Sequence, residues 1–272
     1  MRKELIILLI VVIAIAAWVW WPEPESTPKC PLECQYGCLP MTTRCKEPIC
    51  PSTCWLGCIP GTQTCKQRVI KPEMKLIDAC GVINESSELN FNLQSDKTCL
   101  TIQNDDLILD CKGHSITGGM EQDSFGIYLD GRRNITIKNC IIQNYLSGIF
   151  VSSSSDLSLL DLTADNNSWS GISISSSENI IVDGVSASNN RKSGIELVSS
   201  SNASLSNNQL NENSYGIIIG FSNGIGLLNN YICASSPINL QCEEADIVNE
   251  EGNVCDKSDG CEISCSPCSQ LT

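Results

Sequence analysis

Apolar and polar residues alternate in short segments that recur along the middle of the chain. Each segment opens on a Gly-Ile dipeptide, and the dipeptides begin at 126, 148, 171, 194 and 216, so they are 22 or 23 residues apart. Within a segment the apolar positions are two residues apart, as in Ile127 and Leu129, which is the period of a β-strand with one buried face. The pattern predicts a series of equivalent short strands.

Two further apolar columns follow the same spacing. One contains Ile135, Leu157, Ile180, Ala203 and Ile225, and the other Ile142, Ala164, Ala187, Leu210 and Ile232. Strands this short, separated by small Ser, Asn, Asp and Gly turns, cannot pair with their sequence neighbours in this register, but each can pair with the equivalent strand one repeat later. The composition also opposes helix. We therefore predict an all-β, right-handed parallel β-helix with 22–23 residues per coil.

Polar residues form a column just before the second strand of each repeat, at Asn134, Asp156, Asn179 and Asn202. We expect their side chains to hydrogen-bond to the backbone at the corner of the coil. Residues 100–116 match an earlier coil, and residues 71–98 are expected to cap the open end of the stack. Residues 117–125 are an insertion in a loop, where such scaffolds add binding sites.

An uncharged apolar run extends from Leu5 to Trp21, behind Arg2 and Lys3. As a helix its 17 residues span about 26 Å, close to the hydrocarbon thickness of a membrane. Three tryptophans close the run and Pro22 ends it. We predict a signal-anchor transmembrane helix at 1–22 and a Pro-rich linker at 23–29, with the bulk of the chain outside the cell. The alternatives are a signal peptide cleaved near Ala16 and a buried core helix.

Residues 30–66 contain two 20-residue units with the same cysteine spacing. Their cysteines are Cys30, Cys34, Cys38 and Cys45, and Cys50, Cys54, Cys58 and Cys65. A unit this short cannot bury a sufficient core, so cross-links must stabilise it. Export favours two disulfides per unit, with the pairing open, over zinc, whose sites typically have the tighter Cys-x2-Cys spacing. We interpret the units as a rigid stalk; a small binding module is the alternative.

Ten further cysteines lie downstream. Cys80 and Cys99 bracket the expected cap and are predicted to bridge it, whereas Cys111 and Cys140 either bridge neighbouring corners or pack as free thiols. Cys233 and Cys242 are expected to close the last coil, so we place the β-helix with its cap at 67–233 and a Cys-rich tail at 234–272. The tail contains Cys255, Cys261, Cys265 and Cys268, which suit two disulfides or a four-thiolate zinc site.

Composition narrows the classes of function. The chain has 272 residues and a net charge of -14, which disfavours binding to phosphate backbones, so we expect no nucleic-acid partner. With one histidine, four methionines and oxidised cysteines it lacks the ligands of a copper site. Eighteen cysteines suit an oxidising, extracellular compartment. We expect no cofactor, and the oligomeric state is left open.

The segment from Cys99 to Gly118, CLTIQNDDLILDCKGHSITG, is followed by the Gly-Ile and Asn-Ile-Thr-Ile units. Together they resemble the NosD-like right-handed β-helix repeat family, especially its versions in exported archaeal surface proteins. The resemblance covers about 71–233 and implies the fold. Members of this broad group include carbohydrate-binding proteins, polysaccharide lyases and hydrolases, and a periplasmic copper-site maturation protein, so no single activity is implied.

Few residues suit catalysis on a polysaccharide. Glycosidases use two carboxylates roughly 5–10 Å apart, and Asp161 and Asp183, on neighbouring predicted coils, are the candidate pair. A lyase would instead use Arg132 or Arg133 beside Asp130. Because Leu160 rather than Asp161 aligns with Asp183, we favour a solvated outer column over a catalytic pair.

These observations favour a membrane-anchored extracellular scaffold with a structural or adhesive role. It would contact the membrane through the N-terminal helix and touch glycans or other cell-surface polymers weakly along its coils. The alternative is a polysaccharide lyase or glycoside hydrolase on the same fold. An enzyme predicts a groove with clustered acids, whereas a scaffold predicts flat faces of Ser and Asn.

Overall fold

The computed structural model describes residues 74–271. This part consists of β-strands and one short 3₁₀ helix, η1 (Cys268–Leu271). Within it, no helix has the length and apolar character needed to cross a membrane. The predicted transmembrane helix, the linker and the two Cys-rich units lie outside the described residues.

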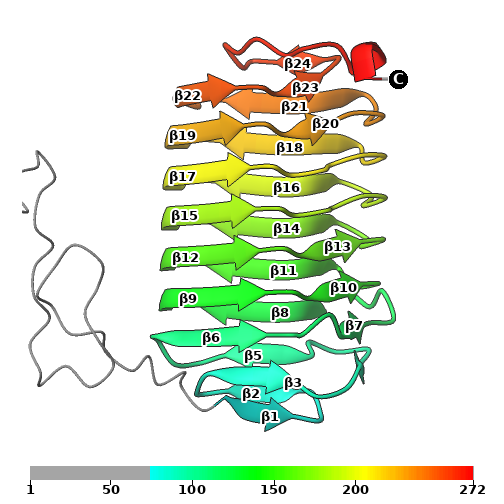
Figure 1. The fold of residues 1–272 in the computed structure, drawn as a ribbon, viewed down its shortest axis with the longest axis vertical. Helices are drawn as coiled ribbons and strands as arrows, with labels where there is room; N and C mark the ends of the chain where they lie inside the picture. Colours follow the sequence, from blue (N-terminus) through cyan, green and yellow to red (C-terminus); the bar gives the residue numbers. More distant parts are fainter. Residues whose placement is uncertain (1–73, 272) are drawn as a thin grey trace, which may run out of the picture. The chain divides into compact units, whose positions relative to one another are not determined.

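The strands form three sheets that run along the stack (Figure 1). Sheet 1 contains β1 (Lys75–Ile77), β3 (Ser87–Leu89), β6 (Leu107–Asp110), β9 (Arg133–Lys138), β12 (Ser155–Leu160), β15 (Glu178–Asp183), β17 (Ser201–Ser206), β19 (Asn223–Leu228) and β22 (Ile247–Glu251). Sheet 2 contains β2 (Gly81–Ile83), β5 (Leu100–Ile102), β8 (Phe125–Asp130), β11 (Ser147–Ser152), β14 (Ser170–Ser175), β16 (Ser193–Val198), β18 (Tyr215–Gly220), β21 (Ile238–Glu243) and β24 (Ser258–Asp259).

The third sheet is shorter and less continuous. Sheet 3 contains β4 (Leu93–Gln94), β7 (Ser115–Thr117), β10 (Ile141–Gln143) and β13 (Thr163–Asp165). Single bridges through Ser186 and Gln209 continue it to the pair β20 (Tyr231–Ile232) and β23 (Val254–Cys255). Each regular coil therefore follows the order sheet 2, sheet 1, sheet 3.

The strand register confirms the predicted stacking. Ile149 of β11 lies opposite Ile127 of β8 on one side and Ile172 of β14 on the other, and both pairings are parallel. Equivalent residues of successive repeats are thus neighbours in a sheet. The earlier coil expected at 100–116 is also present, as β5, β6 and β7.

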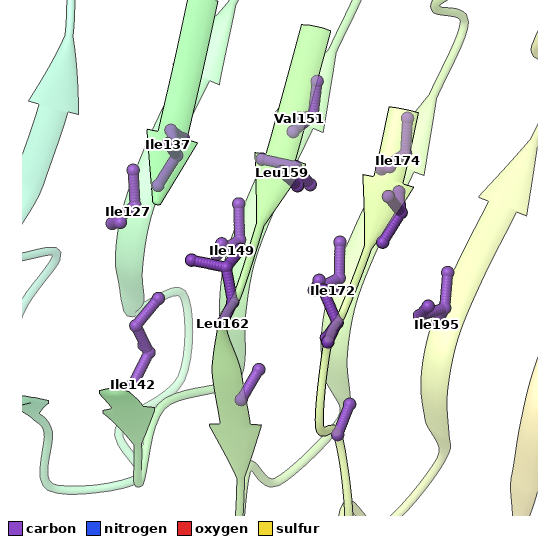
Figure 2. Close-up of a cluster of buried hydrophobic side chains, with 14 of the residues drawn as sticks. Ile127, Ile137, Ile142, Ile149, Val151, Leu159, Leu162, Ile172, Ile174 and Ile195 are labelled. Carbon is purple, nitrogen blue, oxygen red and sulfur yellow. The ribbon is translucent and has the colours of Figure 1, made fainter. Parts of the chain in front are cut away.

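The apolar columns fill the interior of the coils (Figure 2). Ile127, Ile149 and Ile172 are fully buried, as are the columns from sheets 1 and 3. In each regular coil, a glycine precedes the buried isoleucine of the sheet 2 strand. This glycine lies at the start of the strand, close to the backbone of sheet 3. A Cβ on Gly171 would lie 2.7 Å from the carbonyl oxygen of Ala164, which is closer than packed atoms tolerate.

Both ends of the stack differ from our expectation. Residues 75–94 form strands β1 to β4, which pair in parallel with later strands; they make a short first coil instead of a separate cap. At the other end, Leu240 pairs with Ile217 and Ile247 with Ile225, so the coils continue past residue 233 into the segment expected to be a tail. Asn239 stands there in place of the repeat's glycine, which hides the extra coil in the sequence.

The predicted polar column exists, but its hydrogen bonds differ from the prediction. Asn134, Asp156, Asn179 and Asn202 have positive φ, between 53° and 55°, and are exposed. Asn179 Nδ2 donates to Asp156 Oδ1 at 3.0 Å, so the side chains bond one another and not the backbone. The left-handed conformation, which Asn and Asp tolerate best, accounts for these residue types.

Three buried ladders provide side-chain hydrogen bonds to the backbone at the corners, and the third consists of Asn208, Asn230 and Asn253. In the first, the amide of Ser154 donates to Ser177 Oγ at 3.0 Å, and that hydroxyl donates to the carbonyl of Ser175 at 2.8 Å. In the second, the amide of Asn167 donates to Asn190 Oδ1 at 2.9 Å. Asn190 Nδ2 donates to the Ala164 carbonyl at 3.0 Å. These ladders satisfy buried backbone groups, which would otherwise be costly.

Disulfides join neighbouring coils, and no cysteine within 74–271 is free. The bonds are Cys80–Cys99, Cys111–Cys140, Cys233–Cys268, Cys242–Cys261 and Cys255–Cys265. The first is the bridge that we predicted, and the second decides between the two alternatives for Cys111 and Cys140 in favour of a bridge. The last three contradict a zinc site at Cys255, Cys261, Cys265 and Cys268, and only one of the two expected disulfides within this group is present. The added coils bring two of these four cysteines beside Cys233 and Cys242 instead.

Candidate functional site

Asp161 and Asp183 lie at the ends of β12 and β15, on neighbouring coils. Leu160 pairs with Asp183, and the backbone amide of Asp161 donates to the carbonyl of Asp183 at 3.0 Å. The expected offset between the two residues is therefore confirmed. Asp161 also has a positive φ of 51°, so its side chain leaves the backbone in a different direction from that of a strand residue.

The two carboxylates are turned toward the next coil. Asp183 Oδ1 accepts hydrogen bonds from Ser206 Oγ and Asn207 Nδ2, both at 2.7 Å. Asp161 Oδ1 lies over Gly184, 2.8 Å from where a Cβ of that residue would be. Asp183 thus helps to hold adjacent coils together, whereas the exposed Asp161 lines a depression beside Lys112 and Asn139 that does not include Asp183. The arrangement does not suit a pair that faces a substrate across a cleft, as acid catalysis of glycoside hydrolysis requires.

Of the two arginines considered for a lyase, Arg132 has its side chain engaged with its own turn and with the preceding coil. Arg132 Nε donates to the carbonyl of Asp130 at 2.9 Å, and Nη1 lies 3.7 Å from Asp105 Oδ1. The amide of Arg133 donates to Asp105 Oδ1 at 3.1 Å. Arg132 thus fastens the turn between sheets 2 and 1 to the preceding coil.

A charged cluster surrounds Asp110 at the end of β6. Its carboxylate lies 3.3 Å from Lys112 Nζ and 3.5 Å from Lys138 Nζ, and accepts a hydrogen bond from Asn139 Nδ2 at 2.9 Å. Burial works to raise the pKa of Asp110, but the hydrogen bonds from Asn139 and Lys112 and the charge of Lys112 outweigh it and lower the pKa below 3.8. The pKa of Lys112 is raised by its hydrogen bonds to Glu88 and Asp110. The cluster therefore stays ionised, which suits a structural ion network better than an acid or base.

A surface depression with a volume of about 610 Å³ lies along the outer face of sheet 1. We call it the sheet 1 groove. The exposed polar column forms one wall, and outward-facing residues such as Ser158, Ile181 and Ser204 form the floor. Asp156 is the one carboxylate among the lining residues. Hydroxyl and amide groups dominate its polar surface, so the groove can offer neutral donors and acceptors over several coils.

The outer face of sheet 2 carries an aromatic group that our sequence analysis did not identify. Tyr128 and Phe150 lie on adjacent strands with their rings stacked at 5.7 Å and 2°. The ring of Phe125 packs 4.8 Å from that of Phe150. The sequence does contain a signal for this pair, because Tyr128 and Phe150 are one repeat apart, but aromatic residues at this position do not recur in the later coils.

A polar cluster continues from these aromatic rings along sheet 2. Lys192 forms an ion pair with Glu196 and lies 4.4 Å from the ring centroid of Trp169. Glu196 Oε2 also accepts a hydrogen bond from Ser170 Oγ at 3.1 Å. Lys192 and Glu196 are four residues apart, whereas Ser170 comes from the preceding coil. The sequence alone did not place these residues together.

A family model for the right-handed β-helix region matches residues 84–264. The chain belongs to this family. The match extends past residue 233, as the coils do, and it names the hand of the parallel helix that the sequence predicted. A comparison with curated proteins gives no match.

Solved structures with a similar fold include two tailspike proteins and a pectate lyase. The Dettilon tailspike protein is 13% identical with a TM-score of 0.46, over 68% of this chain and 55% of that one. Pectate lyase Pel9A is 11% identical with a TM-score of 0.45, over 70% and 68%. Tailspike protein 2 of Escherichia coli O157:H7 bacteriophage CAB120 is 13% identical with a TM-score of 0.43, over 62% and 34%. The chain thus spans about a third of that tailspike, and at these identities the similarity concerns the fold alone.

Proposed function

We propose that this protein is a non-catalytic β-helix scaffold on the outer face of a cell membrane, where the sheet 1 groove contacts glycans. The observation that carries the proposal is the lining of that groove: amides, hydroxyls and apolar floor residues with a single carboxylate. Sugars present hydroxyls and apolar C–H faces, which such a surface can match. The absence of a second carboxylate among the lining residues argues against hydrolysis there.

The location is part of the same proposal. The apolar run from Leu5 to Trp21 supports an uncleaved anchor, and the Cys-rich units support a stalk between the membrane and the β-helix. The narrower resemblance to NosD-like proteins of exported archaeal type also belongs here. Protease treatment of intact cells should remove the β-helix if it lies outside, and protection from the protease would contradict this location.

A serine-to-tyrosine substitution tests the groove. Ser158 lies on its floor, so Ser158→Tyr should fill it, while Ser186→Tyr places the same side chain on sheet 3, away from it. Binding of the detergent-solubilised full chain to a polysaccharide panel should weaken about tenfold or more in Ser158→Tyr, since loss of a contact worth about 1.4 kcal/mol has this effect. The control should bind like the wild type. Equal binding by both variants would contradict the groove as the contact surface.

The enzymatic alternative has its own measurement. The wild-type protein should release neither reducing ends nor unsaturated products from the same polysaccharides. Products that disappear in Asp161→Asn or Asp183→Asn would overturn the non-catalytic proposal and restore those residues as a catalytic pair.

A further inference from the structure

One outward-facing column of sheet 2 changes from aromatic to polar along the stack. Tyr128, Phe150, Ser173 and Glu196 occupy its successive strands β8, β11, β14 and β16. The ring of Tyr128 stacks on one face of Phe150. The ring of Phe125, from the same coil as Tyr128, also packs against Phe150, at 4.8 Å. On the next coil the strand neighbour is Ser173, whose side chain is too short to cover a phenyl ring. The surface therefore steps down from the ring of Phe150 to a serine hydroxyl.

On the far side, the Glu196 side chain reaches back along its strand, and its carboxylate is held by hydrogen bonds beside Ser170, at the start of β14. The side chain of Glu196 is 13% exposed and is bound by Lys192 and Ser170. Ser170 Oγ lies 2.8 Å from Ser193 Oγ, and both serines are fully buried. The carboxylate is thus preorganised, and a ligand that hydrogen-bonds to it need not order it first.

We propose that the step above Ser173, between Phe150 and Glu196, binds one sugar unit of an uncharged glycan. Strands two coils apart are separated by about 10 Å, which leaves room for one six-membered sugar ring above the serine. The C–H face of the sugar stacks on the side of the half-buried Phe150 ring that is turned toward Ser173. Its hydroxyls bond to the Ser173 hydroxyl and to the Glu196 carboxylate.

The charges at this step select against acidic sugars. Lys192 is paired with Glu196 and packs on Trp169, so it offers no free positive charge to a carboxylate of the ligand. The whole chain carries a net charge of -14, which repels polyanions at a distance. The inference rests on the proposed function in one respect, that the ligand is a glycan. It differs in placing the binding site on sheet 2 and in restricting the ligand to neutral glycans.

Calorimetric titration of the full chain tests the ligand class. The probes are neutral cello-, laminari- and manno-oligosaccharides, compared with oligogalacturonate and oligoalginate. At least one neutral series should bind, and the acidic oligosaccharides should bind at least tenfold more weakly. Equal or tighter binding of the acidic probes, or no binding by any neutral series, would overturn the inference.

Substitutions at Phe150 and Ser173 test the place of binding. Phe150→Leu, which keeps an apolar side chain but no ring, and Ser173→Tyr, which fills the step, should each weaken binding about tenfold. Ser186→Tyr, which places a tyrosine on sheet 3, is the control and should bind like the wild type. If Phe150→Leu also binds like the wild type, the inference is wrong.

The variant in the sheet 1 groove separates this inference from the proposed function. If Ser158→Tyr abolishes neutral-glycan binding while Ser173→Tyr does not, the groove is the contact site and the step is not. If Ser173→Tyr abolishes it while Ser158→Tyr does not, the step stands and the groove proposal fails. The protein could also form a dimer in the absence of sugar. If Phe150→Leu dissociates such a dimer, this face joins two copies of the chain, and the inference is overturned.

Discussion

At the scale of single residues, two carboxylates in the stack have opposite electrostatic surroundings. Asp110 is buried, but hydrogen bonds and the charge of Lys112 stabilise its ionised form and lower its pKa. Burial raises the pKa of Asp165 above 3.8, and the hydrogen bond from the Ser188 amide, at 2.7 Å, offsets this only in part. The first charge therefore stabilises the fold at neutral pH, and the second opposes it.

Asparagine substitutions should show this difference as opposite pH effects. Asp110→Asn should lower the free energy of unfolding at neutral pH, and the loss should vanish as the pH falls through the depressed pKa, below 3.8. Asp165→Asn keeps an oxygen for the Ser188 amide and removes the buried charge. It should raise the free energy of unfolding at neutral pH, with no gain below pH 3.8. Urea unfolding across this pH range measures both, and parallel pH profiles for the two variants would contradict the assignment.

At the scale of structural elements, the coils are held together by ladders of two kinds. In the exposed column, Asp156 and Asn179 adopt the left-handed backbone conformation that the corner requires. Their side chains bond to each other at the surface. The buried ladder of Asn167, Asn190 and Asn213 bonds directly to backbone groups that have no access to water. The buried ladder should therefore contribute far more to stability, although both consist largely of the same residue type.

A pair of asparagine substitutions compares the two ladders. Asn190→Ala removes the bonds to the Asn167 amide and the Ala164 carbonyl, and should cost about 3 kcal/mol of unfolding free energy. Asn179→Gly introduces the residue that Gly224 already supplies in that column, and should cost less than about 1 kcal/mol. Denaturant unfolding of both variants is the measurement. Similar losses in the two would mean that burial does not distinguish the ladders.

At the scale of the whole β-helix, each coil contacts only its neighbours, so the ends are the weakest points. One disulfide strengthens sheet 2 near each end of the stack, Cys80–Cys99 at the first and Cys242–Cys261 at the last coils. In both bonds the two cysteines are 19 residues apart in the sequence. In a chain-entropy description, closing a loop of this length contributes about 3 kcal/mol. The cross-links thus replace the partner coil that a terminal coil lacks.

Removing the C-terminal bond should loosen that end alone. In the double variant Cys242→Ser/Cys261→Ser, amide hydrogen exchange should accelerate in β21 and β24 while β11 to β16 stay protected, because contacts do not extend beyond adjacent coils. The control is Cys111→Ser/Cys140→Ser, which removes a bond between coils nearer the other end. Uniform acceleration along the whole stack in the C-terminal variant would contradict the nearest-neighbour picture.

Much of the fold could be predicted, and the functional surfaces could not. The series from Ile127 to Ile217 was sufficient for the coil register, since buried positions recur with every repeat. The extra coil at Leu240 was missed because Asn239 replaces the repeat's glycine. The cluster of Lys192, Glu196 and Ser170 was missed because outward residues vary from coil to coil and carry no repeat signal.

The repeat spacing by itself defines how the coils stack, because each strand can bury its apolar face only against the same position of the next repeat. Cysteine pairing in the last coils depended on the three-dimensional path, because Cys233 and Cys268 are 35 residues apart in sequence and bridged in space. The step between Phe150 and Glu196 likewise exists only after folding. Its aromatic ring, serine and carboxylate come from three different coils, and parallel pairing brings them into one column.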